Sequence, residues 1–90
     1  MSNAIEILVI DDEAQIRKLL NITLESNDYK TYQAETGKQG ILLAANHPPE
    51  LILLDLGLPD QNGHDVLKEL RKWYINRLLF YRFKIAKTIL

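Results

Sequence analysis

Residues 7–13 read Ile7-Leu8-Val9-Ile10-Asp11-Asp12-Glu13, an apolar run that ends in three acidic residues. Residues 51–56 repeat the arrangement as Leu51-Ile52-Leu53-Leu54-Asp55-Leu56. A short apolar run of this kind is typical of a strand covered on both faces. If the two strands lie side by side and parallel, Asp11, Asp12 and Asp55 meet at the carboxyl edge of a sheet, where ligands of open α/β folds bind.

Three converging carboxylates support two kinds of chemistry. Oxygen ligands of this type bind hard cations. A strand-end aspartate can also accept a phosphoryl group, as in enzymes that form an aspartyl-phosphate intermediate. Each acidic segment alone has a simpler explanation, because Asp11 and Asp12 could begin a helix and Asp55 could begin a turn. Their joint occurrence at the ends of two strands favours a functional site.

The rest of the chain alternates strand and helix patterns. Predicted strands cover residues 5–10, 29–34 and 50–54, and predicted helices follow residues 12, 36 and 63. Thr36 is the expected N-cap of the second helix, and residues 56–63 form a loop rich in turn-forming residues. Trp73 lies on the apolar face of the third helix. This order predicts a parallel sheet with right-handed crossovers.

Composition narrows the function classes. Ninety residues allow one domain, and a net charge of -1 does not favour nucleic acid as a partner. The chain has no cysteine, which excludes disulfides and thiol chemistry. It has no apolar run long enough to cross a bilayer and does not begin like a signal peptide, so we expect a cytoplasmic protein without membrane insertion.

The motifs together resemble the receiver domain of two-component response regulators. They are Asp11-Asp12 after the first strand, Asp55 after the third, and the turn from Leu58-Pro59-Asp60 to Gly63. The longer strings 55–60 and 70–73 are similar to the Kdp-type potassium-response regulators of the winged-helix class. The resemblance implies a flavodoxin-like (CheY-like) three-layer α/β/α fold with a parallel sheet. Here we expect it to be incomplete, with three βα units in residues 1–74 and an atypical tail in 75–90.

The resemblance also implies a role for each acidic residue. Asp55 would accept a phosphoryl group from a histidine of a sensor kinase. Asp12 would bind Mg²⁺ directly, Asp11 mainly through water, and the Gly57 carbonyl would complete the protein ligands together with Asp55. A domain of this kind assists its own phosphorylation without independent turnover. The alternatives are an inert or interaction-only fragment, and a haloacid-dehalogenase-like phosphohydrolase, which needs a second acid where this chain has Gly57.

The tail departs from the family pattern. The resemblance implies a fourth strand that ends in a switch Ser or Thr and a later Lys before Pro, and neither is evident in residues 75–90. Lys84, Lys87 and Thr88 do not occupy the expected places, and we expect no DNA-binding domain in these ninety residues. We therefore expect a truncated receiver that does not bind DNA alone.

The composition of residues 75–90 is consistent with several interpretations. A shifted reading frame over residues 76–85 can encode Ser-Pro-Ile-Ile-Leu-Ser-Val-Gln-Asp, which resembles a receiver's fourth strand, so one hypothesis is a frameshift after Trp73. Alternatively, the apolar residues form a strand or helix that covers a sheet edge, or an interface with a second copy. Basic and aromatic residues are interleaved there, which would also suit a nucleic-acid or membrane surface.

Overall fold

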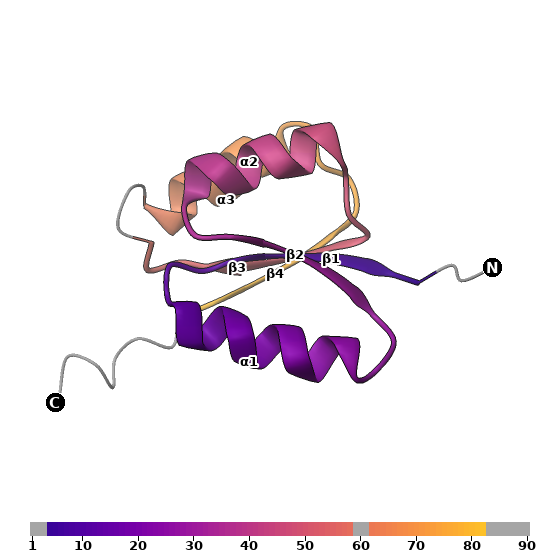
Figure 1. Cartoon of the computed structure of the whole chain (residues 1–90). Coiled ribbons are helices and arrows are strands. Elements are labelled where there is room, and N and C mark those ends of the chain that lie inside the picture. Colours follow the sequence, from indigo (N-terminus) through magenta and orange to yellow (C-terminus); the bar gives the residue numbers. More distant parts are fainter. Residues whose placement is uncertain (1–3, 59–61, 83–90) are drawn as a thin grey trace, which may run out of the picture.

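The computed structural model describes residues 4–58 and 62–82 of the chain. Strands and helices alternate along it, as Figure 1 shows. The elements are β1 (Glu6–Ile10), α1 (Ala14–Glu25), β2 (Lys30–Ala34), α2 (Gly37–Asn46), β3 (Leu51–Asp55), α3 (Gly63–Arg71) and β4 (Arg77–Tyr81). The three predicted strands and three predicted helices are confirmed, and Asp55 is the last residue of its strand.

The four strands form one parallel sheet in the order β2-β1-β3-β4. β1 lies between β2 and β3, so it has a strand on each side, and its last four residues are buried. Val9 and Ile10 are completely buried. This explains why the residues 7–10 are all apolar, since both faces of the strand are covered.

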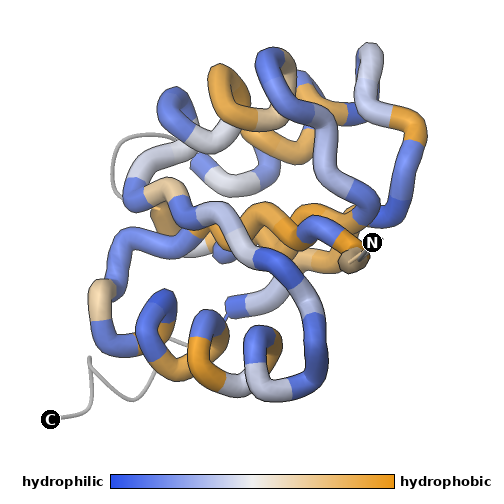
Figure 2. Tube along the Cα trace, turned by 45° about the vertical axis from the view of Figure 1, so that its right-hand side comes forward, coloured by the Kyte–Doolittle hydropathy of each residue, from blue (hydrophilic) through white to orange (hydrophobic). Residues whose placement is uncertain are grey.

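Helices cover the two faces of the sheet (Figure 1). α1 contacts β1 and β2 on one face, while α2 and α3 pack together on the other face against β1, β2 and β3. Figure 2 shows the apolar strands between the helical layers. The core residues lie mainly on the α2–α3 side and are Leu8, Ile10, Ala34, Ala44, Ile52, Leu54, Leu58, Val66, Leu67, Leu70 and Tyr74.

Gly40 permits α2 to approach the centre of the sheet. A Cβ atom at this position would lie 2.4 Å from Cδ1 of Ile10. From the sequence, this glycine is expected only to weaken the helix. In the structure it has a packing role, because the absent side chain leaves room for Ile10 of β1.

β4 is the element for which the sequence left a strand and a helix open. It pairs in parallel with β3 from Leu51↔Arg77 to Asp55↔Tyr81. The buried Tyr74 anchors the approach to this strand, since its hydroxyl donates to the carbonyls of Pro49 at 2.9 Å and Arg77 at 3.2 Å. One interpretation of the tail, a strand that covers a sheet edge, is thereby confirmed. The division of the chain after residue 74 stays a prediction.

Trp73 does not occupy the core position predicted for it. The residue is 37% exposed and its ring makes an edge-to-face contact with the ring of Tyr74. α3 ends at Arg71, and the helical period that would turn residue 73 inward ends with it. Tyr74, at 8% exposure, is the aromatic residue that reaches the core.

The sheet carries an apolar groove beside α1, over β3 and β4. The groove has a volume of about 800 Å³, and its lining includes Leu51, Leu53, Ile75 and Leu79. Leu79 is 58% exposed. The expectation that a second copy of the chain covers apolar residues of the tail stays a prediction.

Candidate functional site

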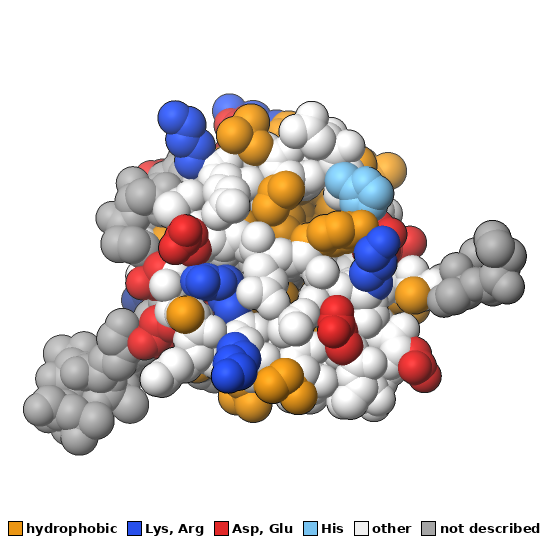
Figure 3. Space-filling model, viewed as in Figure 1, with side chains coloured by type: hydrophobic (Ala, Val, Ile, Leu, Met, Phe, Trp, Pro, Cys, Tyr) orange, Lys and Arg blue, Asp and Glu red, His pale blue; other side chains and the backbone are white. Residues whose placement is uncertain are grey.

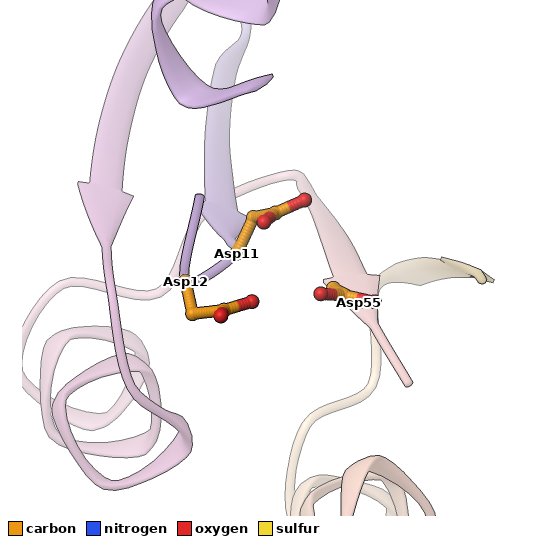
Figure 4. Close-up of side chains that lie close together, drawn as sticks. All are labelled: Asp11, Asp12 and Asp55. Atoms are coloured by element: carbon orange, nitrogen blue, oxygen red, sulfur yellow. The ribbon is translucent and has the colours of Figure 1, made fainter. Parts of the chain in front are cut away.

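The three predicted acidic residues meet at the carboxyl edge of the sheet. Asp11 and Asp12 directly follow β1, and Asp55 ends β3, which is the parallel neighbour of β1 with Ile10 opposite Leu54. Figure 4 shows the three side chains turned toward a common space. Each offers a carboxylate oxygen, and these oxygens all lie within 4.8 Å of one another. The structure thus brings together the residues that the sequence places on separate strands.

Hydrogen bonds from the backbone orient two of the carboxylates. Glu13 N donates to Asp11 Oδ1 at 2.8 Å, and Gly57 N donates to Asp55 Oδ1 at 2.9 Å. Asp11 and Asp55 are completely buried, whereas Asp12 is partly exposed. Backbone donors and a bound cation both stabilise the charge of a buried carboxylate.

The loop after β3 is held in place by Gly63 and Asn62. Gly63 N donates to the carbonyl of Leu56, and the Asn62 side chain accepts a hydrogen bond from His64 N at 2.8 Å, which caps α3. Gly57 itself is exposed beside Asp55. The ligand role of the Gly57 carbonyl stays a prediction. Pro59 and Asp60 of the turn motif lie outside the described residues.

Tyr81 is a site residue that sequence reasoning missed. It ends β4, and its hydroxyl donates to Asp11 Oδ2 at 2.8 Å. The pKa of the Tyr81 hydroxyl is far above its usual value, mainly because the group is buried and also because of the hydrogen bond to Asp11 and the charge of Asp11. The hydroxyl is therefore a neutral donor. The signal that could have revealed it is the apolar run 78–80 followed by a polar aromatic residue, the same arrangement that precedes Asp55.

Arg17 is a second contact that the sequence did not single out. Its guanidinium donates to the backbone carbonyl of Asp11 at 2.8 Å from the first turns of α1. The contact is to the backbone and fixes the loop between β1 and α1. Glu13 is the N-cap residue of α1.

The two histidines lie outside the acidic site. His47 contacts Glu6 Oε1 at 2.7 Å and the Tyr32 hydroxyl at 3.0 Å, next to a cavity of about 270 Å³. His64 is exposed at the start of α3. On the face drawn in Figure 3, basic and acidic side chains are interspersed, without a large patch of one sign. Lys84, Lys87 and Thr88 lie outside the described residues.

A family comparison agrees with the fold and the acidic edge. The model of the response regulator receiver domain matches residues 7–80, a range that includes all three aspartates and most of β4. The chain belongs to the response regulator receiver domain family. This is a family of signalling domains, and the CheY-like fold expected from the motifs is confirmed.

Curated relatives include Kdp-type regulators. The chain is 51% identical over 67 residues to the transcriptional regulatory protein KdpE of Mycobacterium tuberculosis (strain CDC 1551 / Oshkosh). It is 43% identical over 67 residues to the KDP operon transcriptional regulatory protein KdpE of Escherichia coli (strain K12). Each match covers 74% of this chain but only 30% of the relative. The chain therefore spans about a third of the length of these proteins.

Solved structures share the fold along most of the chain. A CheY-like receiver domain protein from Methanospirillum hungatei JF-1 has a TM-score of 0.82 at 23% identity, over 97% of this chain and 72% of the other. The response regulator domain of Thermotoga maritima CheB has a TM-score of 0.80 at 30% identity, over 87% and 60%. Among the described residues, none of the helices is long and apolar enough to span a membrane.

Proposed function

We propose that this receiver domain accepts a phosphoryl group on Asp55 from a phosphohistidine of a sensor kinase, with Mg²⁺ bound by Asp11, Asp12 and Asp55. The observation that carries the proposal is the convergence of three carboxylates from two strands, with oxygens within 4.8 Å of one another. Membership of the receiver family supports the same assignment.

The donor set fits Mg²⁺. The cluster consists of carboxylate oxygens, the ligands that hard cations prefer, and Mg²⁺ usually takes only one or two protein carboxylates and keeps several waters. Partly exposed Asp12 lies beside the two buried aspartates, so the site is accessible on one side. Bound Mg²⁺ would neutralise the carboxylates and stabilise charge on the transferred phosphoryl group.

The residues of the chain have distinct parts in the transfer. A carboxylate oxygen of Asp55 forms the new bond to phosphorus, while the bond between phosphorus and the kinase histidine breaks and the leaving nitrogen retains the electron pair. Asp55 is restrained by the bond from Gly57 N to its Oδ1. Phosphoryl transfer depends mainly on positioning and charge stabilisation, which this restrained carboxylate supports.

Acetyl phosphate with Mg²⁺ provides a direct test without the kinase. We expect a covalent adduct that is stable in acid and lost with hydroxylamine, and its absence in Asp55→Asn. Asp28→Asn is the matched control, since Asp28 is exposed and adopts a positive φ of 69° that asparagine tolerates. An adduct of equal yield in Asp55→Asn would refute the assignment of the acceptor.

Other outcomes separate the alternative functions. Steady release of phosphate from acetyl phosphate would indicate a phosphohydrolase, but the position two residues after Asp55 is Gly57, which has no carboxylate. No adduct under any condition would indicate an interaction-only fragment. The two KdpE relatives are named transcriptional regulatory proteins. We therefore propose that phosphorylation of this domain is a step in the regulation of transcription.

A further inference from the structure

Tyr81 connects the last described strand to the proposed cation site. Its hydroxyl donates to Asp11 Oδ2 at 2.8 Å, although the two residues are separated by 70 positions in the chain. We propose that the Tyr81 hydroxyl is a built-in competitor of the cation at Asp11 and sets the affinity of the site for Mg²⁺. This inference rests on the proposed function, and it concerns a positioning residue that acts through Asp11.

The backbone of β4 holds Tyr81 in place. Tyr81 is paired with Asp55 in the parallel ladder, and its carbonyl accepts a hydrogen bond from Leu56 N at 2.8 Å. Its side chain borders an apolar pocket that also includes Ile16, Leu20 and Leu53. The sheet therefore fixes the backbone position from which the hydroxyl reaches Asp11.

The direction of the effect follows from electrostatics. A tyrosine hydroxyl that donates to a carboxylate points the positive end of its O–H dipole at that oxygen. Mg²⁺ is attracted by negative charge at the same carboxylate, so the hydroxyl opposes it. Loss of the hydroxyl would not release Asp11, because Glu13 N still donates to Asp11 Oδ1 at 2.8 Å. Removing the hydroxyl should therefore strengthen cation binding.

The coupling must act in both directions. If the Tyr81 contact weakens Mg²⁺ binding, Mg²⁺ binding weakens the Tyr81 contact by the same factor. β4 is at the edge of the sheet and pairs with β3 alone among the described strands. The state of the cation site would thus be communicated to β4, whose outer side pairs with no other described strand.

The test compares the Mg²⁺ affinity of the unmodified full chain with that of four variants by calorimetric titration with MgCl₂. We expect Tyr81→Phe to bind Mg²⁺ about three- to tenfold more tightly than the unmodified chain, the range that corresponds to one competing hydrogen bond. Tyr74→Phe is the matched control, because the Tyr74 hydroxyl donates to the carbonyls of Pro49 and Arg77 instead of to an aspartate. In an Asp11→Asn background, Tyr81→Phe should have no effect.

A spectroscopic readout distinguishes competition from a structural role. Mg²⁺ should produce a near-ultraviolet tyrosine difference spectrum in the unmodified chain and in Tyr74→Phe, and this signal should disappear in Tyr81→Phe. Equal or weaker Mg²⁺ affinity in a folded Tyr81→Phe would overturn the inference while Mg²⁺ binding by the unmodified chain preserves the proposed function. If neither the unmodified chain nor Tyr81→Phe binds Mg²⁺, both the inference and the proposed metal site are wrong.

Discussion

Gly63 lies directly against the backbone of Leu56. A Cβ atom at residue 63 would be 2.3 Å from Leu56 Cα and 2.7 Å from its carbonyl oxygen. Backbone atoms cannot rotate away as the end of a side chain can. The contact joins the start of α3 to the residue that follows Asp55, and this close approach requires the absence of a side chain at position 63.

We expect Gly63→Ala to reduce the free energy of unfolding by roughly 1–3 kcal/mol, the usual cost of overpacking. Gly57→Ala is the matched control in the same loop. Its Cβ would lie 3.5 Å from Asp55 Oδ1, an ordinary contact, and none of the described glycines has a positive φ. Urea unfolding of both variants measures the difference. Equal losses for the two substitutions would show that the Leu56 contact is relieved by movement of the loop.

The sequence predicted the features of the fold that depend on local patterns and missed those that depend on packing between distant segments. The β-α alternation and the acidic strand ends depend on local patterns, so the sheet, its parallel order and the meeting of Asp11 with Asp55 could be predicted. The close approaches at Gly63 and Gly40 depend on packing between distant segments. The apolar run of β4 is short and stands among basic and aromatic residues, so it indicated a strand or a helix equally well, and the contact of Tyr81 with Asp11 was missed.

The N-cap of α2 provides a second stability test. Thr36 Oγ1 accepts a hydrogen bond from Gln39 N at 3.1 Å, in agreement with the predicted cap. Thr36→Ala should lower the free energy of unfolding by about 1 kcal/mol, since it leaves a helix N–H without its side-chain acceptor. Thr23→Ala, at an exposed position within α1, should be neutral or slightly stabilising. Thermal unfolding followed by circular dichroism compares the two variants.

Tyr74 should make stability dependent on alkaline pH. Burial and then the charge of Glu50 raise its pKa from 10.0 to about 12. In the unfolded chain the hydroxyl loses its proton near pH 10, whereas the folded chain retains it. The stabilisation is therefore complete below pH 10 and is lost as the pH rises toward 12.

Tyr74→Phe isolates this contribution. The unmodified chain should lose stability more steeply between pH 10 and 12 than the variant, because only the unmodified chain has the Tyr74 proton to lose. The difference between the two urea midpoints, measured at intervals across that range, removes contributions from other titrating groups. A difference that does not change with pH would contradict the assigned environment of Tyr74.

Repulsion among the aspartates should make Asp55→Asn more stable than the unmodified chain when a chelator removes divalent cations. Two unit charges at the 4.8 Å upper limit of these separations repel by about 3.5 kcal/mol at an effective dielectric constant of about 20. Because Asp12 is partly exposed and water screens its charge, we expect a net gain of roughly 1–3 kcal/mol. Asparagine retains an oxygen that can accept the bond from Gly57 N, so the loop contact is preserved.

Mg²⁺ should reduce or reverse the difference in stability between Asp55→Asn and the unmodified chain. A ligand that binds only the folded chain stabilises it by about 2.7 kcal/mol at a hundred times its dissociation constant, and Asp55→Asn binds the cation less tightly because one charge is gone. Asp28→Asn, far from the cluster along the chain, should respond to Mg²⁺ as the unmodified chain does. Urea unfolding of the unmodified chain and of both variants, in chelator and in excess Mg²⁺, measures the effect of the cation on each. Stabilisation of Asp55→Asn by Mg²⁺ equal to that of the unmodified chain would place the cation away from Asp55.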